Sequence, residues 1–302
     1  MVKRKVIEQD VVRIRELISE VLNVSGYADI ERMGGLTNHT YKITLNNGNA
    51  YVVRIPGEGT EELINRADER VSTLLACKIG IDAKLIHFGE KGEKISEYID
   101  GAETMSPEKI RLNENLRKVA RILKKLHTTN ENTHIPFNVF DMASSYEKII
   151  EKGNVKLYED YSQVKERIYK IKQNFDQKGN VWHVPCHNDP LCENWVLSGN
   201  GQMHLIDWEY AGMNDGMWDL ADVSIEASLT HRQDVSLLTA YFERKPTLDE
   251  WERFCANKLF LDYLWTLWGK ARVPFDGESM EKYAAERYAR LKENLSVFPE
   301  SL

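Results

Sequence analysis

Four polar residues of the chain have types and a spacing that would let them act together. They are His187, Asp189, Asn194 and Asp207. All four fall in one segment, VPCHNDPLCENWVLSGNGQMHLIDWEY, whose residue pattern predicts a strand, a loop, a strand, a Gly-Asn-Gly turn and a strand. The pattern puts Asp189 and Asn194 at the mouth of a hairpin, and the turn brings back Asp207, which follows Asn194 by 13 residues. Three oxygen-bearing side chains are therefore expected to converge.

These residue types suit phosphoryl transfer, in which catalysis consists mostly of positioning and charge neutralisation. One Asp can accept the proton of a substrate hydroxyl, while an Asn and a second Asp can hold Mg²⁺ through oxygen atoms. A purely local alternative is that Asn, Asp, Pro and Gly gather here because they favour turns. Another is a zinc site, but structural zinc usually uses paired ligands at short spacings and no second pair appears. The ligands of such a zinc site would be His183, Cys186, His187 and Cys192.

Length and charge limit the class of protein. With 302 residues, 42% hydrophobic and 29% charged, the chain can bury a sizeable core and form two lobes. A net charge of −7 argues against nucleic acid and anionic membranes as partners, so a small molecule is expected. Charges interrupt every apolar run near the N-terminus, unlike in a signal peptide, and no segment has the apolar length of a membrane span. The four cysteines do not have the spacing of a disulfide framework. These features predict a cytoplasmic protein without membrane insertion and leave its oligomeric state open.

The N-terminal third is predicted to be rich in strands and the remainder in helices. Helices are expected at 11–22 and 61–78, and strands at 30–33, 40–45, 51–55, 84–88 and 94–99. From residue 106 onward helical patterns dominate, except for the hairpin segment. The change in composition at Asp100-Gly101 suggests a boundary between a lobe of residues 1–100 and a lobe of residues 101–302, with a nucleotide between them.

Two features of the N-terminal part suit a nucleotide. Glycine in GGLTN, including Gly35, would let backbone N–H groups approach phosphates, and the side chains of Thr37 and Asn38 could add hydrogen bonds. A Gly-Gly turn is, however, also an ordinary connection in a hairpin. The strand AYVVRI carries one charge, Arg54, which is either an edge residue or a permanent cation for phosphates. The next helix offers Glu69 as its partner.

The choice of Glu69 competes with other acids on the same predicted helix, namely Glu61, Glu62 and Asp68. Just before the proposed boundary, the backbone from Glu97 to Ile99 is expected to pair with an adenine. No Gly-x-x-x-x-Gly-Lys-Ser/Thr sequence occurs, which argues against a P-loop enzyme.

The acceptor end of the site is predicted from aromatic residues. Trp265 and Trp268 are three apart in LDYLWTLWGKA and so share a helix face, an arrangement that also occurs in ordinary cores. Tyr210 and Tyr283 offer further aromatic walls, and Glu226 offers a carboxylate. Aromatic faces beside an acid suit a quaternary ammonium ion, with about 0.5 to 2 kcal/mol for each good cation–π contact.

Five motifs, GGLTNHTYKI, YVVRIPG, CHNDPLCENW, IDWEYAGMND and LWTLWGKA, together resemble a choline kinase of the bacterial type. That group lies within the choline/ethanolamine kinase and aminoglycoside phosphotransferase superfamily. The pattern His-x-Asp-x-x-x-x-Asn followed by Ile-Asp-Trp resembles the catalytic and metal loops of protein-kinase-like enzymes. The resemblance covers about residues 30–290. It implies an α+β, protein-kinase-like bilobal fold with an N-terminal antiparallel sheet lobe and a larger, mainly helical C-terminal lobe.

The resemblance also implies an activity, the ATP-dependent phosphorylation of the choline hydroxyl to phosphocholine, with ATP and Mg²⁺ as cofactors. Asp189 would be the catalytic base that contacts the substrate, Asn194 and Asp207 the magnesium ligands, and Arg54 with Glu69 the ion pair on the phosphate side. The choline pocket would be lined by Tyr210, Glu226, Trp265, Trp268 and Tyr283.

Other acceptors and a non-catalytic role remain as alternatives. The acceptor is alternatively ethanolamine or an aminoglycoside. A choline-binding pseudokinase is the alternative from a different class, and the presence of Arg54, Asp189, Asn194 and Asp207 argues against it.

Overall fold

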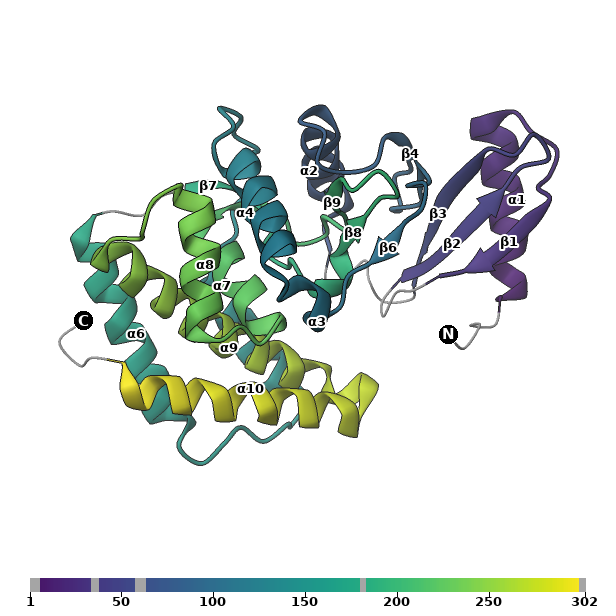
Figure 1. Ribbon diagram of the computed structural model, residues 1–302. Helices are drawn as coiled ribbons and strands as arrows, with labels where there is room; N and C mark the ends of the chain where they lie inside the picture. Colours follow the sequence, from purple (N-terminus) through teal and green to yellow (C-terminus); the bar gives the residue numbers. More distant parts are fainter. Residues whose placement is uncertain (1–5, 34–37, 58–63, 180–182, 299–302) are drawn as a thin grey trace. The chain divides into compact units, whose positions relative to one another are not determined.

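The computed structural model describes residues 6–33, 38–57, 64–179 and 183–298. The chain divides into two compact units (Figure 1). The first, called the sheet unit here, comprises residues 1–106 and 193–211, and the second, the helical unit, comprises residues 107–192 and 212–302. The segment 193–211 thus groups with N-terminal residues, whereas a single boundary after residue 100 stays a prediction.

The sheet unit contains an antiparallel sheet of five strands in the order β1-β2-β3-β5-β4 within the described residues. Apart from α2, the ends of the elements expected from the sequence shift by at most three residues. The elements before residue 106 are α1 (Glu8–Leu22), β1 (Asp29–Arg32), β2 (Asn38–Thr44), β3 (Ala50–Pro56), α2 (Arg66–Lys78), β4 (Leu85–Phe88), β5 (Lys94–Glu97) and β6 (Glu103–Thr104).

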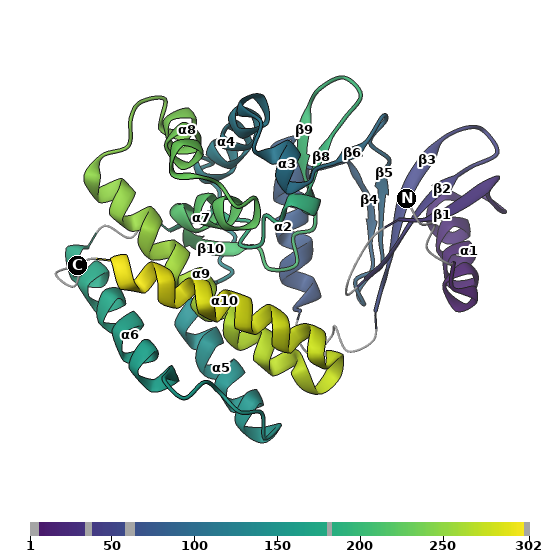
Figure 2. The same ribbon diagram turned by 60° about the horizontal axis from the view of Figure 1, so that its bottom comes forward.

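The core of this sheet forms because a helix and two strands each present one apolar side. In α1, Ile14 and Ile18 are four residues apart and so share a face. They pack in one cluster with Tyr41 and Ile43 of β2 and Val53 of β3, all of them fully buried. The helix lies along β1–β3 (Figure 2). This packing fixes β3, the strand that carries the lone arginine.

Helix α2 begins later than expected because Asn65 caps it. The Asn65 side chain accepts hydrogen bonds from the backbone N–H groups of Ala67 at 3.0 Å and Asp68 at 3.4 Å, which satisfies two of the unpaired donors at a helix start. The expected residues 61–63 lie outside the described residues. The late start leaves Arg66 in the first turn of the helix.

The strands of the hairpin segment belong to two different sheets. Strands β8 (Trp195–Leu197) and β9 (Met203–Leu205) form the expected hairpin, and β8 also pairs with β6. Strand β7 (His183–Cys186) instead pairs with β10 (Gly212–Asp215). The chain between β7 and β8 turns through a short 3-10 helix, η2 (Cys192–Asn194), so the strands on its two sides belong to different sheets.

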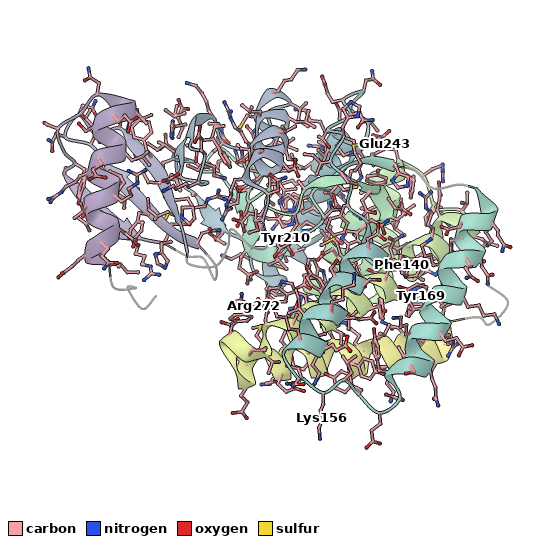
Figure 3. The ribbon with its side chains drawn as sticks, turned by 180° about the vertical axis from the view of Figure 1, so that it is seen from behind. Phe140, Lys156, Tyr169, Tyr210, Glu243 and Arg272 are labelled. Carbon is pink, nitrogen blue, oxygen red and sulfur yellow. The ribbon has the colours of Figure 1, made fainter. Side chains whose placement is uncertain are left out.

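The helical unit is built around a long helix, α9, whose capping box pairs Thr247 with Glu250. Helix α10 lies along it (Figures 1 and 2). Helices α5 and α6 meet through Phe140 and Tyr169, whose ring centroids are 5.1 Å apart (Figure 3). The helices are α3 (Pro107–Ile110), α4 (Asn113–His127), α5 (Val139–Lys152), α6 (Tyr161–Lys178), α7 (Gly216–Glu226), α8 (His231–Phe242), α9 (Leu248–Asp276) and α10 (Glu278–Val297).

Among the described residues, no helix combines the length and the apolar character that crossing a bilayer requires.

The close contact of α9 with α10 depends on a glycine. A Cβ added at Gly269 would lie 2.8 Å from Cδ1 of Tyr283 and 3.1 Å from Cβ of Ala284. Gly269→Ala gains about 1 kcal/mol in helix propensity but costs about 1 to 3 kcal/mol in overpacking, so we expect a lower melting temperature by calorimetry. Gly26→Ala is the control, because its Cβ would meet no atom within 4 Å. Equal melting temperatures for the two variants would contradict this account of the packing.

Candidate active site

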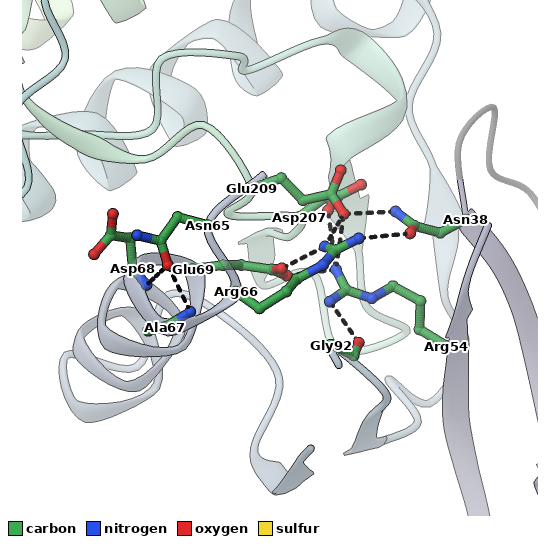
Figure 4. Close-up of polar contacts among 10 residues, drawn as sticks. All are labelled: Asn38, Arg54, Asn65, Arg66, Ala67, Asp68, Glu69, Gly92, Asp207 and Glu209. Atoms are coloured by element: carbon green, nitrogen blue, oxygen red, sulfur yellow. Dashed lines mark hydrogen bonds and ion pairs between the residues drawn. The ribbon is translucent and has the colours of Figure 1, made fainter. Parts of the chain in front are cut away.

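The lone charge of β3 lies in a buried ion pair. The Nη1 atom of Arg54 is 2.5 Å from Oε1 of Glu69 on α2, and its Nη2 atom donates to the carbonyl of Gly92 at 2.9 Å (Figure 4). Arg54 is 4% exposed and Glu69 is 1% exposed. The structure thus selects Glu69 over Asp68 as the partner, and Glu61 and Glu62 lie outside the described residues. Arg54 is held in place by contacts at both ends of its guanidinium group.

Three further residues extend this pair into a network. Arg66 donates through Nη1 to Oε2 of Glu69 at 2.7 Å and to Oε1 of Glu209 at 2.6 Å. Asn38 donates to the same Glu209 oxygen at 2.7 Å. Sequence reasoning missed Arg66 and Glu209. Arg66 precedes Glu69 by one helical turn, and this spacing was the available signal; Glu209 had none beyond its closeness to Asp207.

The network balances buried charge. Three carboxylates, those of Glu69, Asp207 and Glu209, have oxygens within 4.8 Å of one another, and two guanidinium groups oppose them. Burial favours a higher pKa for Glu69, but the charge of Arg54 and its hydrogen bond outweigh burial and hold the pKa of Glu69 below its ordinary value. Burial and then the charge of Asp207 raise the pKa of Glu209. Glu69 is therefore the anion that the two arginines stabilise most.

Asp207 and Asn194 are neighbours in the sheet unit. The N–H of Ile206 donates to the carbonyl of Asn194 at 2.9 Å, which sets Asn194 beside the residue preceding Asp207, at the open end of the β8–β9 hairpin. Asp207 has φ +71°, a left-handed conformation that Asp tolerates better than most residues. Asn194 and Asp207 thus lie at the same end of the hairpin, and their role as magnesium ligands stays a prediction.

A magnesium ion fits the oxygen atoms of Asp207 and Asn194 by their chemistry. The Oδ1 atom of Asp207 is buried and has no hydrogen-bond partner among the described residues, although Nη1 of Arg54 lies 3.6 Å away. Glu69 and Glu209 already have arginine partners at 2.7 Å or less. Asp207 is therefore the carboxylate of this group with an oxygen left for an ion.

The other predicted nucleotide residues divide into three cases. Gly35 and Thr37 lie outside the described residues. Asn38 is 3% exposed and uses its side chain toward Glu209. Glu97 pairs with Lys84 on the surface, and the carbonyl of Ile99 accepts from the N–H of Ala102 at 3.0 Å. Their roles in nucleotide binding stay predictions.

In the helical unit, the loop that carries Asp189 is held by the carboxylate of Asp219 on α7. Its Oδ2 accepts from the N–H of His187 and its Oδ1 from the N–H of Asn188, both at 2.8 Å. The indole of Trp218 donates to the carbonyl of Asn188 at 2.9 Å. Asn188 has φ +67°, so these bonds maintain a backbone conformation that is costly for most residues. These hydrogen bonds fix the backbone immediately before Asp189.

A buried histidine, His127, is a further partner of Asp219, and sequence reasoning missed it as well. The Nε2 atom of His127 lies 3.0 Å from Oδ2 of Asp219, and its Nδ1 lies 2.9 Å from the hydroxyl of Tyr241. The signal for Asp219 was available, because Asp219, Asp222 and Glu226 fall at helical spacings i, i+3 and i+7 on a helix that is otherwise mostly apolar. No local pattern marks His127.

The predicted acceptor residues of the helical unit form one cluster. The ring centroids of Trp265 and Trp268 are 6.1 Å apart, and those of Trp268 and Tyr283 are 5.7 Å apart. Glu226 pairs with Arg287, whose guanidinium carbon lies 4.6 Å from the centroid of the Tyr283 ring. Aromatic faces and a carboxylate thus lie close together with Arg287, which was not predicted, and their role in binding the acceptor stays a prediction. Tyr210 belongs to the sheet unit, and its role stays a prediction.

The residues of the alternative zinc site do not form a metal-binding group in the described part of the chain. Among the described residues, the three-residue groups with ligand atoms close enough for one metal are Glu69, Asp207 and Glu209, and His127, Cys186 and Asp219. Neither is the proposed zinc set. In the second group the Asp219 oxygens already accept two backbone hydrogen bonds.

Comparisons with known proteins find a matching protein family and similar solved structures. The sequence model of a protein family described as choline/ethanolamine kinase matches residues 30–268. A choline/ethanolamine kinase family protein from Mesorhizobium loti is 33% identical, with a TM-score of 0.83 over 94% of each chain. The choline kinase LicA from Streptococcus pneumoniae is 30% identical, with a TM-score of 0.82 over 96% of this chain and 99% of that one. A structure of LicA in complex with AMP is 29% identical, with a TM-score of 0.81 over 97% of this chain and 100% of that one.

A more distant likeness concerns the fold alone. The GDP complex of an aminoglycoside 2'-phosphotransferase is 13% identical, with a TM-score of 0.67 over 95% of this chain and 97% of that one. The expected protein-kinase-like fold, with an N-terminal antiparallel sheet and a mainly helical remainder, is confirmed.

The buried Arg54–Glu69 pair predicts a pH-dependent stability. Glu69→Gln removes the counter-charge of a buried arginine and should lower the free energy of unfolding by about 3 kcal/mol at neutral pH. Because the folded-state pKa of Glu69 is lowered, its contribution is present above the ordinary glutamate pKa and is lost as the pH falls through the folded value. Urea unfolding should therefore show the difference between the wild type and the variant shrinking toward acid.

The control is Glu114→Gln, which breaks the exposed pair with Lys118, and no measurable change is expected at either pH. A Glu69→Gln variant as stable as the control at neutral pH would show that the buried pair does not stabilise the sheet unit.

Proposed function

Because this chain belongs to the choline/ethanolamine kinase family, we propose that it transfers the γ-phosphoryl group of ATP to the hydroxyl of choline. Membership makes the chain a kinase that acts on a small molecule and uses ATP with Mg²⁺. The LicA relatives are choline kinases by name, and this supports choline as the acceptor. Four free cysteines suit a reducing compartment, and we place the enzyme in the cytoplasm.

One observation carries the choice of a cationic acceptor. In the helical unit, the ring of Trp268 contacts the rings of both Trp265 and Tyr283, and the charge of Glu226 acts on Tyr283. Aromatic faces attract a cation through the ring quadrupole, and a quaternary ammonium offers no N–H group for stronger hydrogen bonds. The same faces suit the methyl groups of choline. A polyamine sugar would instead call for many carboxylates.

The chemistry assigns a task to each polar residue. The hydroxyl oxygen of choline attacks the γ-phosphorus, the bond from that phosphorus to the bridging oxygen of ADP breaks, and Asp189 accepts the hydroxyl proton. Asp219 does not touch the reactants in this proposal and acts as a positioning residue for the loop of Asp189. Arg54 neutralises phosphate charge as a permanent cation.

Asp207 and Asn194 would hold Mg²⁺, which supplies further neutralisation of the phosphates when it is bound. Tyr210 and Glu226 are proposed to border the acceptor, and Asn38, Glu97 and Ile99 the nucleotide.

Ethanolamine is the second candidate acceptor, because the matching family is described by both substrates. An aminoglycoside is less well supported, since the likeness to an aminoglycoside phosphotransferase concerns the fold alone. A pseudokinase would be expected to have lost some of the residues Arg54, Asp189, Asn194 and Asp207, and this chain keeps all four.

Asp189→Ala should lower kcat with choline by about 10²- to 10⁴-fold, because the proton acceptor is lost. ATP binding, measured by calorimetry, should stay within a few-fold of the wild type, because in this proposal Asp189 serves the acceptor hydroxyl rather than the nucleotide. Near-normal turnover in a coupled ADP-release assay would remove Asp189 from the role of base.

Trp268→Leu should raise the KM for choline by roughly tenfold, since a cation–π contact contributes about 0.5 to 2 kcal/mol, and should raise the KM for ethanolamine less. The control is Trp251→Leu, because Trp251 packs on His231 and Phe254 instead, and its KM values should match the wild type. A wild-type preference for ethanolamine over choline would count against the aromatic cluster as a quaternary-ammonium site.

A further inference from the structure

A carboxylate without a partner lies at the centre of the acidic face of α7. Asp222 is 1% exposed, and neither of its side-chain oxygens has a hydrogen-bond partner among the described residues. It follows Asp219 by three residues and precedes Glu226 by four, so all three acids share one side of the helix. Asp222 thus lies between the carboxylate that positions the catalytic loop and the carboxylate beside the aromatic cluster.

An arrangement of this kind is costly to the folded protein. Burying a carboxylate without hydrogen bonds is unfavourable, and nearly all buried polar groups in folded proteins have partners. Burial raises the pKa of Asp222 well above its ordinary value, and the charges of Glu226, Asp189 and Asp219 raise it further, whereas Arg287 lowers it. The folded chain alone does not compensate this group.

The neighbouring acids differ, because each has a partner within the chain. Arg287 pairs with Glu226. Arg290 donates to both oxygens of Asp262, at 2.6 and 2.8 Å. The guanidinium of Arg287 already has its face over the Tyr283 ring. Arg287 and Arg290 of α10 are therefore engaged by other groups, and the carboxyl group of Asp222 has no hydrogen-bond partner among the described residues.

Unpaired donors accompany this unpaired acceptor. The Nε atom of Arg287 and the indole Nε1 atom of Trp268 are also buried and lack a hydrogen-bond partner among the described residues. Trp268 belongs to the aromatic cluster, and Arg287 is electrostatically coupled to Asp222. Unsatisfied polar atoms that gather beside aromatic faces are expected where a ligand completes the hydrogen bonding and the charge balance.

We propose that Asp222 is the counter-ion for the positively charged head group of the acceptor, so that this residue sets the preference of the enzyme for cationic over neutral alcohols. This inference rests on the proposed phosphorylation of an amino alcohol. Glu226, which Arg287 neutralises, then shapes the site without supplying net charge. The aromatic rings select the size and methylation of the head group, and Asp222 selects its charge.

The test pairs a charge change in the protein with a charge change in the ligand. Asp222→Asn keeps the shape of the side chain and removes its charge, and 3,3-dimethylbutan-1-ol replaces the nitrogen of choline by carbon. For the wild type, kcat/KM should favour choline strongly over the neutral alcohol. In the variant this preference should fall by about tenfold or more, through a higher KM for choline with kcat for choline nearly unchanged.

Stability provides a readout that separates this role from a structural one. Removing an uncompensated buried charge should leave the melting temperature of Asp222→Asn equal to or above that of the wild type. The matched control is Asp234→Asn, because Asp234 is 4% exposed but has partners in Ser224 and Lys258. That variant should have a lower melting temperature and an unchanged preference for choline.

The proposal is overturned if Asp222→Asn keeps the wild-type preference, or if it loses stability as Asp234→Asn does. Asp222→Ser, which also lacks the charge, should repeat the loss of preference and provides a second variant if the first does not fold. A wild-type enzyme that phosphorylates neither choline nor ethanolamine would contradict the proposed function instead. A wild-type enzyme active on choline with an unaltered Asp222→Asn variant contradicts the role of Asp222 alone.

Discussion

The hydrogen bonds that the carboxylate of Asp219 accepts determine the conformation of the loop that carries Asp189 in the helical unit. The carboxylate is fully buried, and it accepts the backbone N–H groups of His187 and Asn188. Without these bonds, two buried backbone donors would lose these acceptors and the left-handed conformation at Asn188 would lose their support. The apolar packing of α7 therefore serves more than stability. By fixing Asp219, it fixes the backbone immediately before Asp189.

Buried carboxylates of two kinds occur among the described residues, those with a charged partner and those without a hydrogen bond. In the sheet unit, Glu69 and Glu209 are each bonded to arginine, so that the network holds a permanent cation in a defined place. In the helical unit, Asp222 is buried without a hydrogen bond to any residue in the described part of the chain. A paired buried charge positions other groups, whereas an unpaired one is stable only if something outside the chain compensates it. This difference leads to the proposal that a cationic acceptor completes the site.

Several site residues were predictable because they mark a break in a local pattern. Arg54 is the one charge in an apolar strand, and the pair of tryptophans repeats at helical spacing. Their positions in β3 and α9 agree with those patterns. Arg66 and Glu209 were missed because their contacts join α2 to the segment after β9, and the separation of 143 residues hides the pairing. The helical spacing of Asp219, Asp222 and Glu226 could be recognised in the sequence. The contacts of Asp219 with the backbone of His187 and Asn188 could not, because those residues lie in a distant segment.

The sequence by itself determined the fold class, the order of most elements and the residue types for phosphoryl transfer, because apolar periodicity and turn residues act over short distances. It also carried the motifs that identify the family. Only the tertiary structure decided which acid pairs with Arg54, that β7 pairs with β10, and that Asp222 is buried without a hydrogen-bond partner among the described residues. These depend on how elements pack, since burial and charge compensation are set by neighbours that are distant in the chain.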